Sequence, residues 1–184
     1  KPRGIVCTTS DKDRAPNVVD LIQYPARVYP VGRLDKDSEG LLLMTNQGEL
    51  ANEIMHAGNF HEKEYLVTVD QPFNAAFLKK MREGVELKEL GVTTRPCKVE
   101  AAGVKTFRII LTQGLNRQIR RMCAELGYRV VTLKRVRIMN IHLGKLNTGD
   151  FRRATPKELE ELEWQLEQAR LEREEAELLA GQDE

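Results

Sequence analysis

The chain of 184 residues is 41% hydrophobic, which is enough for one sizeable domain with a buried core. No apolar run approaches the length of a membrane span, and no N-terminal pattern predicts a signal peptide. Its three cysteines, Cys7, Cys97 and Cys123, are widely separated and lack the spacing of zinc ligands. We therefore expect ordinary thiols in a cytoplasmic protein.

The net charge of +1 hides an asymmetry between the body of the chain and its C-terminal end. Residues 156–184 carry 3 Lys and Arg against 11 Asp and Glu, a net charge of −8. Residues 1–155 carry 26 Lys and Arg against 17 Asp and Glu, a net charge of +9. A basic body favours a polyanionic partner such as nucleic acid. We expect a folded body over 1–155 and a C-terminal helix with an acidic tail over 156–184.

The first half of the chain predicts short strands and short helices in irregular order. Apolar runs between turn residues predict strands at 5–7, 28–31 and 41–44, the last of them a buried core strand. Helical spacing predicts one helix at 17–22, capped by Asn17, and another at 49–56.

The second half predicts the same mixture with longer elements. Strands are predicted at 65–69, 97–101, 106–112, 128–133 and 136–142, the second and third as a hairpin. Helices are predicted from Asn74 to Gly84, from Asn116 to Leu126, and from the capping box that begins at Thr155, with fraying after about Arg170. This order predicts an α+β fold with a mixed sheet rather than a βαβ alternation.

The helix predicted at 116–126 is the most basic element of the chain. Asn116 is the predicted N-cap, and Gly127 the residue that ends the helix. Four apolar residues fall at helical spacing, Ile119, Met122, Cys123 and Leu126. Three arginines lie off that stripe, and residues 114–137 hold seven basic residues against one acid. This charge cluster predicts a surface for phosphates.

Asp35 is the candidate catalytic carboxylate. It lies on a loop between Arg33 and the apolar run at 41–44, where a side chain is exposed yet held still. Asp35 to Gly40 imitates the start of a calcium loop, but the twelfth position is Asn46 instead of Glu. An aspartyl-nucleophile phosphatase would have its apolar strand before the aspartate rather than after it. The plain alternative is a loop carboxylate paired with Arg33.

Two further residues suit a nucleophilic aspartate. Arg120, if buried nearby, would favour the charged carboxylate. The alternative is that Arg120 contacts phosphate or lies on a solvent-exposed helix face. Tyr65 could stack on a flipped base or exchange a proton, whereas its plain role is to fill a strand face.

Four separated stretches resemble one family, the pseudouridine synthases. Residues 32–43, GRLDKDSEGLLL, resemble the family's catalytic motif, and Lys63-Glu64-Tyr65 resembles its strand motif with the active-site tyrosine. Residues 114–122, GLNRQIRRM, resemble the third motif in the form of the RsuA branch, which acts on ribosomal RNA, and Lys1 to Gly4 resembles the first motif of that branch. The closest subtype is a large-subunit ribosomal RNA synthase.

The resemblance implies a role for each matching residue. Asp35 would be the nucleophile, attacking the ribose or the uracil ring, and Arg120 would pair with it. Tyr65 would contact the flipped uridine and abstract a proton, and Arg33 would prop the RNA stack that the uridine leaves. The remaining candidates for RNA binding are Lys63, Asn116, Arg117, Gln118, Arg121, Arg129, Lys134 and Arg135. No metal or organic cofactor is implied, because bond breaking and bond formation stay within one nucleotide.

The resemblance also implies the fold and the partners. We expect a largely antiparallel sheet flanked by helices, with the active-site cleft on the sheet and residues 1–155 as the catalytic domain. The substrate would be a structured stem-loop of large-subunit ribosomal RNA, bound by a monomer. Members of this branch carry a small N-terminal RNA-binding domain of the S4 type, which we expect to be missing from this chain. The rival interpretation is a non-enzymatic RNA-binding or ribosome-assembly module with an idle pocket.

Overall fold

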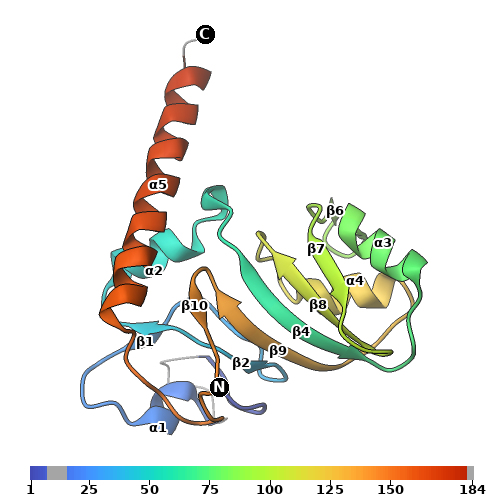
Figure 1. The fold of residues 1–184 in the computed structure, drawn as a ribbon, viewed down its shortest axis with the longest axis horizontal. Helices are drawn as coiled ribbons and strands as arrows, with labels where there is room; N and C mark the ends of the chain where they lie inside the picture. Colours follow the sequence, from blue (N-terminus) through green and yellow to red (C-terminus); the bar gives the residue numbers. More distant parts are fainter. Residues whose placement is uncertain (8–15, 182–184) are drawn as a thin grey trace.

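The computed structural model describes residues 1–7 and 16–181 (Figure 1). Its helices are α1 (Val18–Ile22), α2 (Gly48–Met55), α3 (Ala75–Glu83), α4 (Gln118–Glu125) and α5 (Pro156–Ala180), with a 3-10 turn η1 at Ala57–Asn59. Its strands are β1 (Tyr29–Pro30), β2 (Glu39–Gly40), β3 (Met44–Thr45), β4 (Lys63–Val69), β5 (Glu86–Leu87), β6 (Val92–Thr93), β7 (Lys98–Ala101), β8 (Thr106–Leu111), β9 (Val130–Ile138) and β10 (Ile141–His142). Within these ranges no helix has the length and apolar character to cross a bilayer.

The central sheet has the order β10-β9-β4-β8-β7, and β2 joins it by pairing with β9. The five strands of the main path are antiparallel, whereas β2 runs parallel to β9. The long strands β4 and β9 run through the middle, with α3 and α4 towards one end and α5 standing at the other (Figure 1). The predicted α+β fold with a mixed, largely antiparallel sheet is therefore confirmed.

Two hydrophobic clusters lie at the two ends of this sheet. The larger cluster joins alternate residues of β4 and β8, which share one face, to α3 and α4; its members include Val67, Phe107, Ile109, Phe77 and Met122. The smaller cluster joins α2 and α5 to the end of β9; its members include Ile54, Leu162, Leu166, Ile138 and Ile141. The span between the clusters is where β2 and its preceding loop attach.

Several predicted elements are confirmed. Asn17 caps α1 through Asp20 N, Asn74 caps α3 through Phe77 N, and β7 and β8 form the predicted hairpin. The capping box at Thr155 also forms at the start of α5. The predicted strand at 5–7 is wrong except for one bridge, between Val6 and Asn17.

The predicted core strand at 41–44 is wrong, because this segment changes partners. Gly40 pairs with Arg135 of β9, and Leu41 N still donates to Arg135 O at 2.8 Å. Met44 instead pairs with Pro30 of β1. A continuous strand would hold one partner, so the exchange leaves 41–43 outside both ladders.

Two further boundaries differ from the prediction. The strands predicted at 128–133 and 136–142 are one strand, β9, followed by the short β10. The basic pair Lys134-Arg135 does not interrupt β9, because Arg135 turns inward. Helix α5 does not fray after Arg170 but continues to Ala180, and Arg173 donates to Asn59 Oδ1 at 2.7 Å. The last three residues of the acidic tail lie outside the described part.

Arg135 is a structural residue in the interior. It is 3% exposed, and its Nε donates to Leu41 O at 2.9 Å. Gly40 lies opposite it with φ +114°, and a Cβ at Gly40 would come within 2.2 Å of Arg135 O. Both features let the segment that follows the Asp35 loop lie directly on β9.

The first prediction concerns Arg135. Replacement by alanine removes the donor to the Leu41 carbonyl and leaves a cavity, so Arg135→Ala should lower the free energy of unfolding by about 2 kcal/mol or more. Lys134→Ala, at the neighbouring and more exposed position, is the control and should change it by less than about 0.5 kcal/mol. Urea unfolding measures both. Equal effects would mean that Arg135 does not hold β2 on β9.

The second prediction concerns the start of α5. Arg152 donates to both oxygens of Glu158, at 2.7 and 2.8 Å, and these bonds with the Thr155 backbone lower the pKa of that carboxyl to about 2. A lowered carboxyl pKa stabilises the fold above the usual carboxyl pKa, and the stabilisation is lost as the pH falls towards 2. Glu158→Gln should therefore cost about 1 kcal/mol near pH 7, as loss of a helix cap does.

That difference should shrink as the pH falls below about 4.5 and vanish below about pH 2. Thermal unfolding followed by circular dichroism at 222 nm measures it, with Glu160→Gln as the control on the same helix. A difference that does not depend on pH would show that the Glu158 charge is not the stabilising group.

Candidate active site

The Asp35 loop binds the start of α4 mainly through the Asp37 carboxylate. Arg117 donates to both Asp37 oxygens, at 3.0 and 2.9 Å, although the two residues are 80 positions apart. Arg120 Nη2 donates to Asp37 O at 3.1 Å and to Ser38 Oγ at 3.2 Å. The hydrogen bonds from Arg117 lower the pKa of the Asp37 carboxyl. Two arginines of one helix therefore hold the loop.

The N-terminal segment holds the same loop from its other side. Gly4 N donates to Lys36 O at 2.7 Å, and Gly40 N donates to Lys1 O at 3.0 Å. Lys1 Nζ donates to Ser38 O at 2.6 Å. The first four residues thus close around the turn that carries Asp35 and Asp37.

The start of α4 differs from the prediction in its cap. The N-cap residue is Arg117, in the left-handed region at φ 49°, and Asn116 is not the cap. The Asn116 side-chain oxygen instead accepts from Arg121 Nη2 at 2.9 Å. Arg121 also pairs with Glu89. The left-handed backbone at a bulky residue is uncommon, and it turns the Arg117 side chain towards the loop.

Asp35 lies beside Arg117 rather than Arg120. Its Oδ2 is 3.4 Å from Arg117 Nη1, and its side chain is 36% exposed. The predicted Asp35–Arg120 pair is replaced by bonds from Arg120 to Asp37 and Ser38. Burial lowers the pKa of Arg120, and the charges of Asp37 and Asp35 oppose that shift, so Asp35 still acts on Arg120 electrostatically. Within the described residues, Arg120 Nε is buried without a hydrogen-bond partner.

Tyr65 lies on β4 across from the strand that holds the loop. Its register partners are Arg135 of β9 and Ile109 of β8, and a bulge falls between Glu64 and Tyr65. Gly40 also pairs with Arg135, so two strand spacings, about 10 Å, separate the Cα atoms of Gly40 and Tyr65. Bulges commonly re-aim a side chain beside an active site. The Tyr65 side chain is partly buried against the larger hydrophobic cluster, and within the described residues it makes no hydrogen bond to the Asp35 loop.

The other predicted RNA contacts divide by burial. Arg33, Asn116, Arg117 and Arg129 are exposed, and Arg121 and Lys134 are partly exposed. Three candidates are buried, Lys63, Gln118 and Arg135. Burial, and then the charge of Arg135, lower the pKa of Lys63. Gln118 Oε1 accepts from Leu115 N at 3.2 Å, which organises the turn before α4. Gln118 and Arg135 thus support the turn and the loop from inside, whereas Lys63 is buried in β4.

Sequence reasoning missed part of the basic hollow beside Asp35. A hollow of about 480 Å³ is lined by Arg3, Gly4, Lys36, Asp37 and Arg117. Arg3 lay inside a recognised motif, but nothing in the sequence placed it beside α4. Asp37 lies within the calcium-loop and phosphatase imitations, and neither pattern predicted its pairing with Arg117. Within the described residues no group of three His, Cys, Asp or Glu side chains could hold a metal ion.

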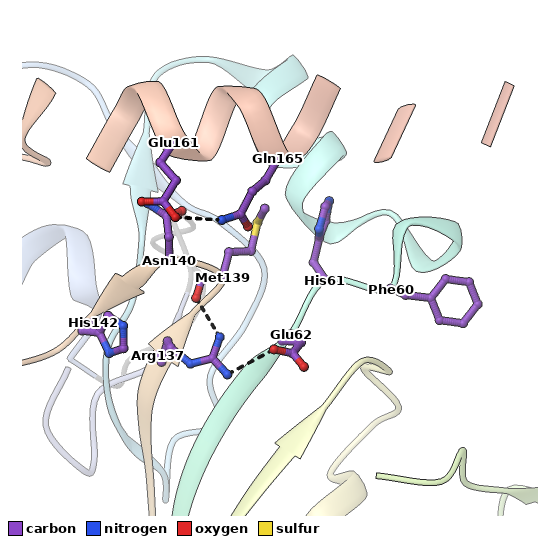
Figure 2. A pocket seen from close by; sticks show the side chains of 9 residues that line it. All are labelled: Phe60, His61, Glu62, Arg137, Met139, Asn140, His142, Glu161 and Gln165. Carbon is purple, nitrogen blue, oxygen red and sulfur yellow. Dashed lines mark hydrogen bonds and ion pairs between the residues drawn. The ribbon is translucent and has the colours of Figure 1, made fainter. Parts of the chain in front are cut away.

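A second hollow, of about 560 Å³, lies between α5, the β9–β10 turn and the start of β4 (Figure 2). Glu161 and Gln165 reach into it from α5, and Arg137 and Glu62 face each other below them (Figure 2). None of the residues predicted for catalysis lines it. The loop at Asp35 and the basic hollow are therefore the better candidate site.

Residues 1–125 match the model of the family described as RNA pseudouridylate synthase. The chain is 52% identical over 162 residues to the Escherichia coli protein named dual-specificity RNA pseudouridine synthase RluF, covering 88% of this chain and 55% of that protein. It thus spans about half the length of that relative. It is 36% identical to the ribosomal large subunit pseudouridine synthase B of Bacillus subtilis, covering 88% of this chain and 68% of that protein.

A solved structure titled as a crystal structure of pseudouridylate synthase has the same architecture. It matches with a TM-score of 0.82 and 33% identity, over 88% of this chain and 70% of that one. The family resemblance and the fold predicted from the motifs are thereby confirmed. The chain belongs to the RNA pseudouridylate synthase family, in its RsuA branch, and has the pseudouridine synthase fold.

Proposed function

We propose that this chain converts a uridine of large-subunit ribosomal RNA to pseudouridine, with Asp35 as the nucleophile. The observation that carries the proposal is the position of Asp35, on a loop held by Arg117 and Arg120 at the edge of a basic hollow. RluF and the Bacillus subtilis protein carry names for this reaction, and the latter is named for the large ribosomal subunit. The RNA class is taken from these relatives.

The reaction needs one bond exchange within one nucleotide. The bond between uracil N1 and ribose C1′ breaks, the ring turns, and C5 bonds to C1′, after which C5 loses its proton and N1 gains one. The Asp35 carboxylate would attack either C1′ or the uracil ring and is released at the end. Tyr65 would take up a proton, since its register partner Arg135 also pairs with Gly40 at the end of the Asp35 loop. The exchange is balanced without an oxidant or a cofactor.

Two arginines suit the carboxylate for this role. Arg117 lies 3.4 Å from Asp35, and the less exposed Arg120 lies close enough to interact with its charge. Their positive charges attract the carboxylate, which is the nucleophilic form of this side chain. A base inside structured RNA must be flipped to reach Asp35, and exposed cations such as Arg33 and Lys36 can hold the neighbouring phosphates.

The same geometry weighs against a pure binding module. Such a module needs exposed cations, but it has no need of a carboxylate among them, since a carboxylate repels phosphate. Asp35 and Asp37 both lie within the basic cluster. We further propose that residues 1–155 carry the catalytic domain, that 156–184 add a C-terminal helix and acidic tail, and that the chain acts as a cytoplasmic monomer.

The third prediction tests the nucleophile. Asp35→Asn keeps the shape of the side chain but removes its charge, so tritium release from RNA labelled at uracil C5 should fall about 10³-fold or more. RNA affinity should stay within about twofold, because Asp35 contributes no attraction to phosphate. Asp20→Asn, on the exposed face of α1, is the matched control and should keep the parent rate.

Normal turnover by Asp35→Asn would contradict the assignment. If the parent protein releases no tritium from free RNA or from ribosome-assembly intermediates, the binding-module interpretation would replace the proposal.

The fourth prediction concerns the RNA surface. Arg129 is exposed beside the start of β9, and no carboxylate of the described residues lies within ion-pair distance of its side chain. Arg129→Ala should weaken binding of all RNA sequences alike and reduce the slope of log K against log salt by about 1. Arg170→Ala, on the acidic helix α5, is the control. Fluorescence anisotropy at several salt concentrations measures both, and an unchanged slope would remove Arg129 from the surface.

A further inference from the structure

An exposed aromatic side chain stands beside the turn that leads to α4. Phe60 is 55% exposed, and its ring projects away from the other residues that line the larger hollow (Figure 2). The Arg95 guanidinium lies over this ring, with Cζ 4.2 Å from the ring centroid. One face of the phenyl ring is thus covered by a flat cation, while more than half of the residue is open to solvent.

The backbone at Phe60 is also unusual. Phe60 ends the η1 turn in the left-handed region, at φ 53° and ψ 36°. Glycine and asparagine adopt this region readily, whereas a bulky aromatic residue seldom does. The local backbone therefore does not account for phenylalanine here. Because the ring is exposed, packing in the core does not explain the phenylalanine either. We therefore look for a binding role of this side chain.

Arg95 is held by two hydrogen bonds to uncharged groups. Its Nη1 donates to Thr112 O at 3.2 Å, and its backbone N donates to Gln113 Oε1 at 3.1 Å. In the described part of the chain, no carboxylate lies within ion-pair distance of Arg95. A fixed cation without a protein counter-ion is complementary to a phosphate.

The pair is connected to the candidate active site through the turn before α4. Gln113, which binds the Arg95 backbone, also lies within 3.5 Å of Gln118 Nε2, one residue after Arg117. Leu111, at the end of β8, pairs with Lys63, which is three residues after Phe60 and two before Tyr65. The Arg95–Phe60 pair therefore borders the end of the sheet where the proposed catalytic strand begins.

We propose that the Arg95–Phe60 pair is a stacking platform for one unpaired base of the RNA, with Arg95 binding the phosphate of that nucleotide. This inference rests on the proposed function, since it takes RNA as the substrate. An aromatic ring accepts any base, because every base has a π-face, and a guanidinium stacks in the same way. The platform would thus hold an unpaired nucleotide near the target and would require a loop or bulge rather than a continuous duplex.

The test compares two RNA probes, a single-stranded oligouridylate of eight nucleotides and a blunt RNA duplex. Phe60→Ala and Phe60→Leu should weaken binding of the single strand about 5- to 100-fold, the range for loss of one stacked base. Neither should change duplex affinity by more than about twofold, because the phosphate contacts remain. Phe60→Tyr should restore single-strand binding. Phe151→Ala is the control, because Phe151 is exposed but packs edge-on against Tyr24.

A fluorescence measurement provides a direct readout. In a Trp164→Phe background, which removes the one native tryptophan, Phe60→Trp should be quenched by the single strand and not by the duplex. Native Trp164, exposed on α5, should not be quenched by either probe.

Two results would overturn the platform: parent-like single-strand affinity in Phe60→Ala and Phe60→Leu, or an equal loss for both probes. Failure of the proposed function is seen separately, as absence of Asp35-dependent tritium release. Parent-like turnover without any Phe60 effect would therefore reject the platform alone.

Discussion

The double hydrogen bond between Arg117 and Asp37 is the interaction on which the site depends. It joins a loop near the N-terminus to a helix 80 residues later, and it places Asp35 within 3.4 Å of the same guanidinium. Both side chains are about 40% exposed, so the pair contributes only about 0.2–1 kcal/mol to stability. Its value is positional, because two parallel bonds fix the loop in orientation as well as in distance.

The sheet supplies the rigid frame for that pair. Strand β9 binds β4 on one side and carries the parallel β2 on the other, so the Asp35 loop leaves the sheet from a fixed point. The hydrogen bond from Arg135 to the Leu41 carbonyl and the missing Cβ at Gly40 let β2 lie directly on β9. The N-terminal residues 1–4 also hydrogen-bond to the loop. A loop held on three sides can carry an exposed carboxylate among cations without collapsing onto any one of them.

Sequence reasoning predicted much of this arrangement, and its failures have physical causes. Helical spacing located α3 and α4, caps located the starts of α3 and α5, and alternation located β4, β7 and β8. The partner of Asp35 could not be predicted, because both Arg117 and Arg120 reach the loop and the left-handed backbone at Arg117 is not visible in the sequence. The sequence also could not predict the burial of Arg135, since a charged side chain is expected at the surface. Only the pairing of β2 with β9 places this side chain in the interior. The break at 41–43 depends on partners far away in the chain.

The most direct measurement of the central claim is a double-mutant cycle on Asp37 and Arg117, read as single-turnover tritium release from RNA labelled at uracil C5. If their pairing orients the Asp35 loop, Asp37→Asn and Arg117→Gln should each slow release about tenfold or more, while the double variant should be no slower than the slower single one. Thermal unfolding should shift little in all three, since the pair is exposed. Losses that multiply in the double variant would contradict the account, because the two residues would then act independently.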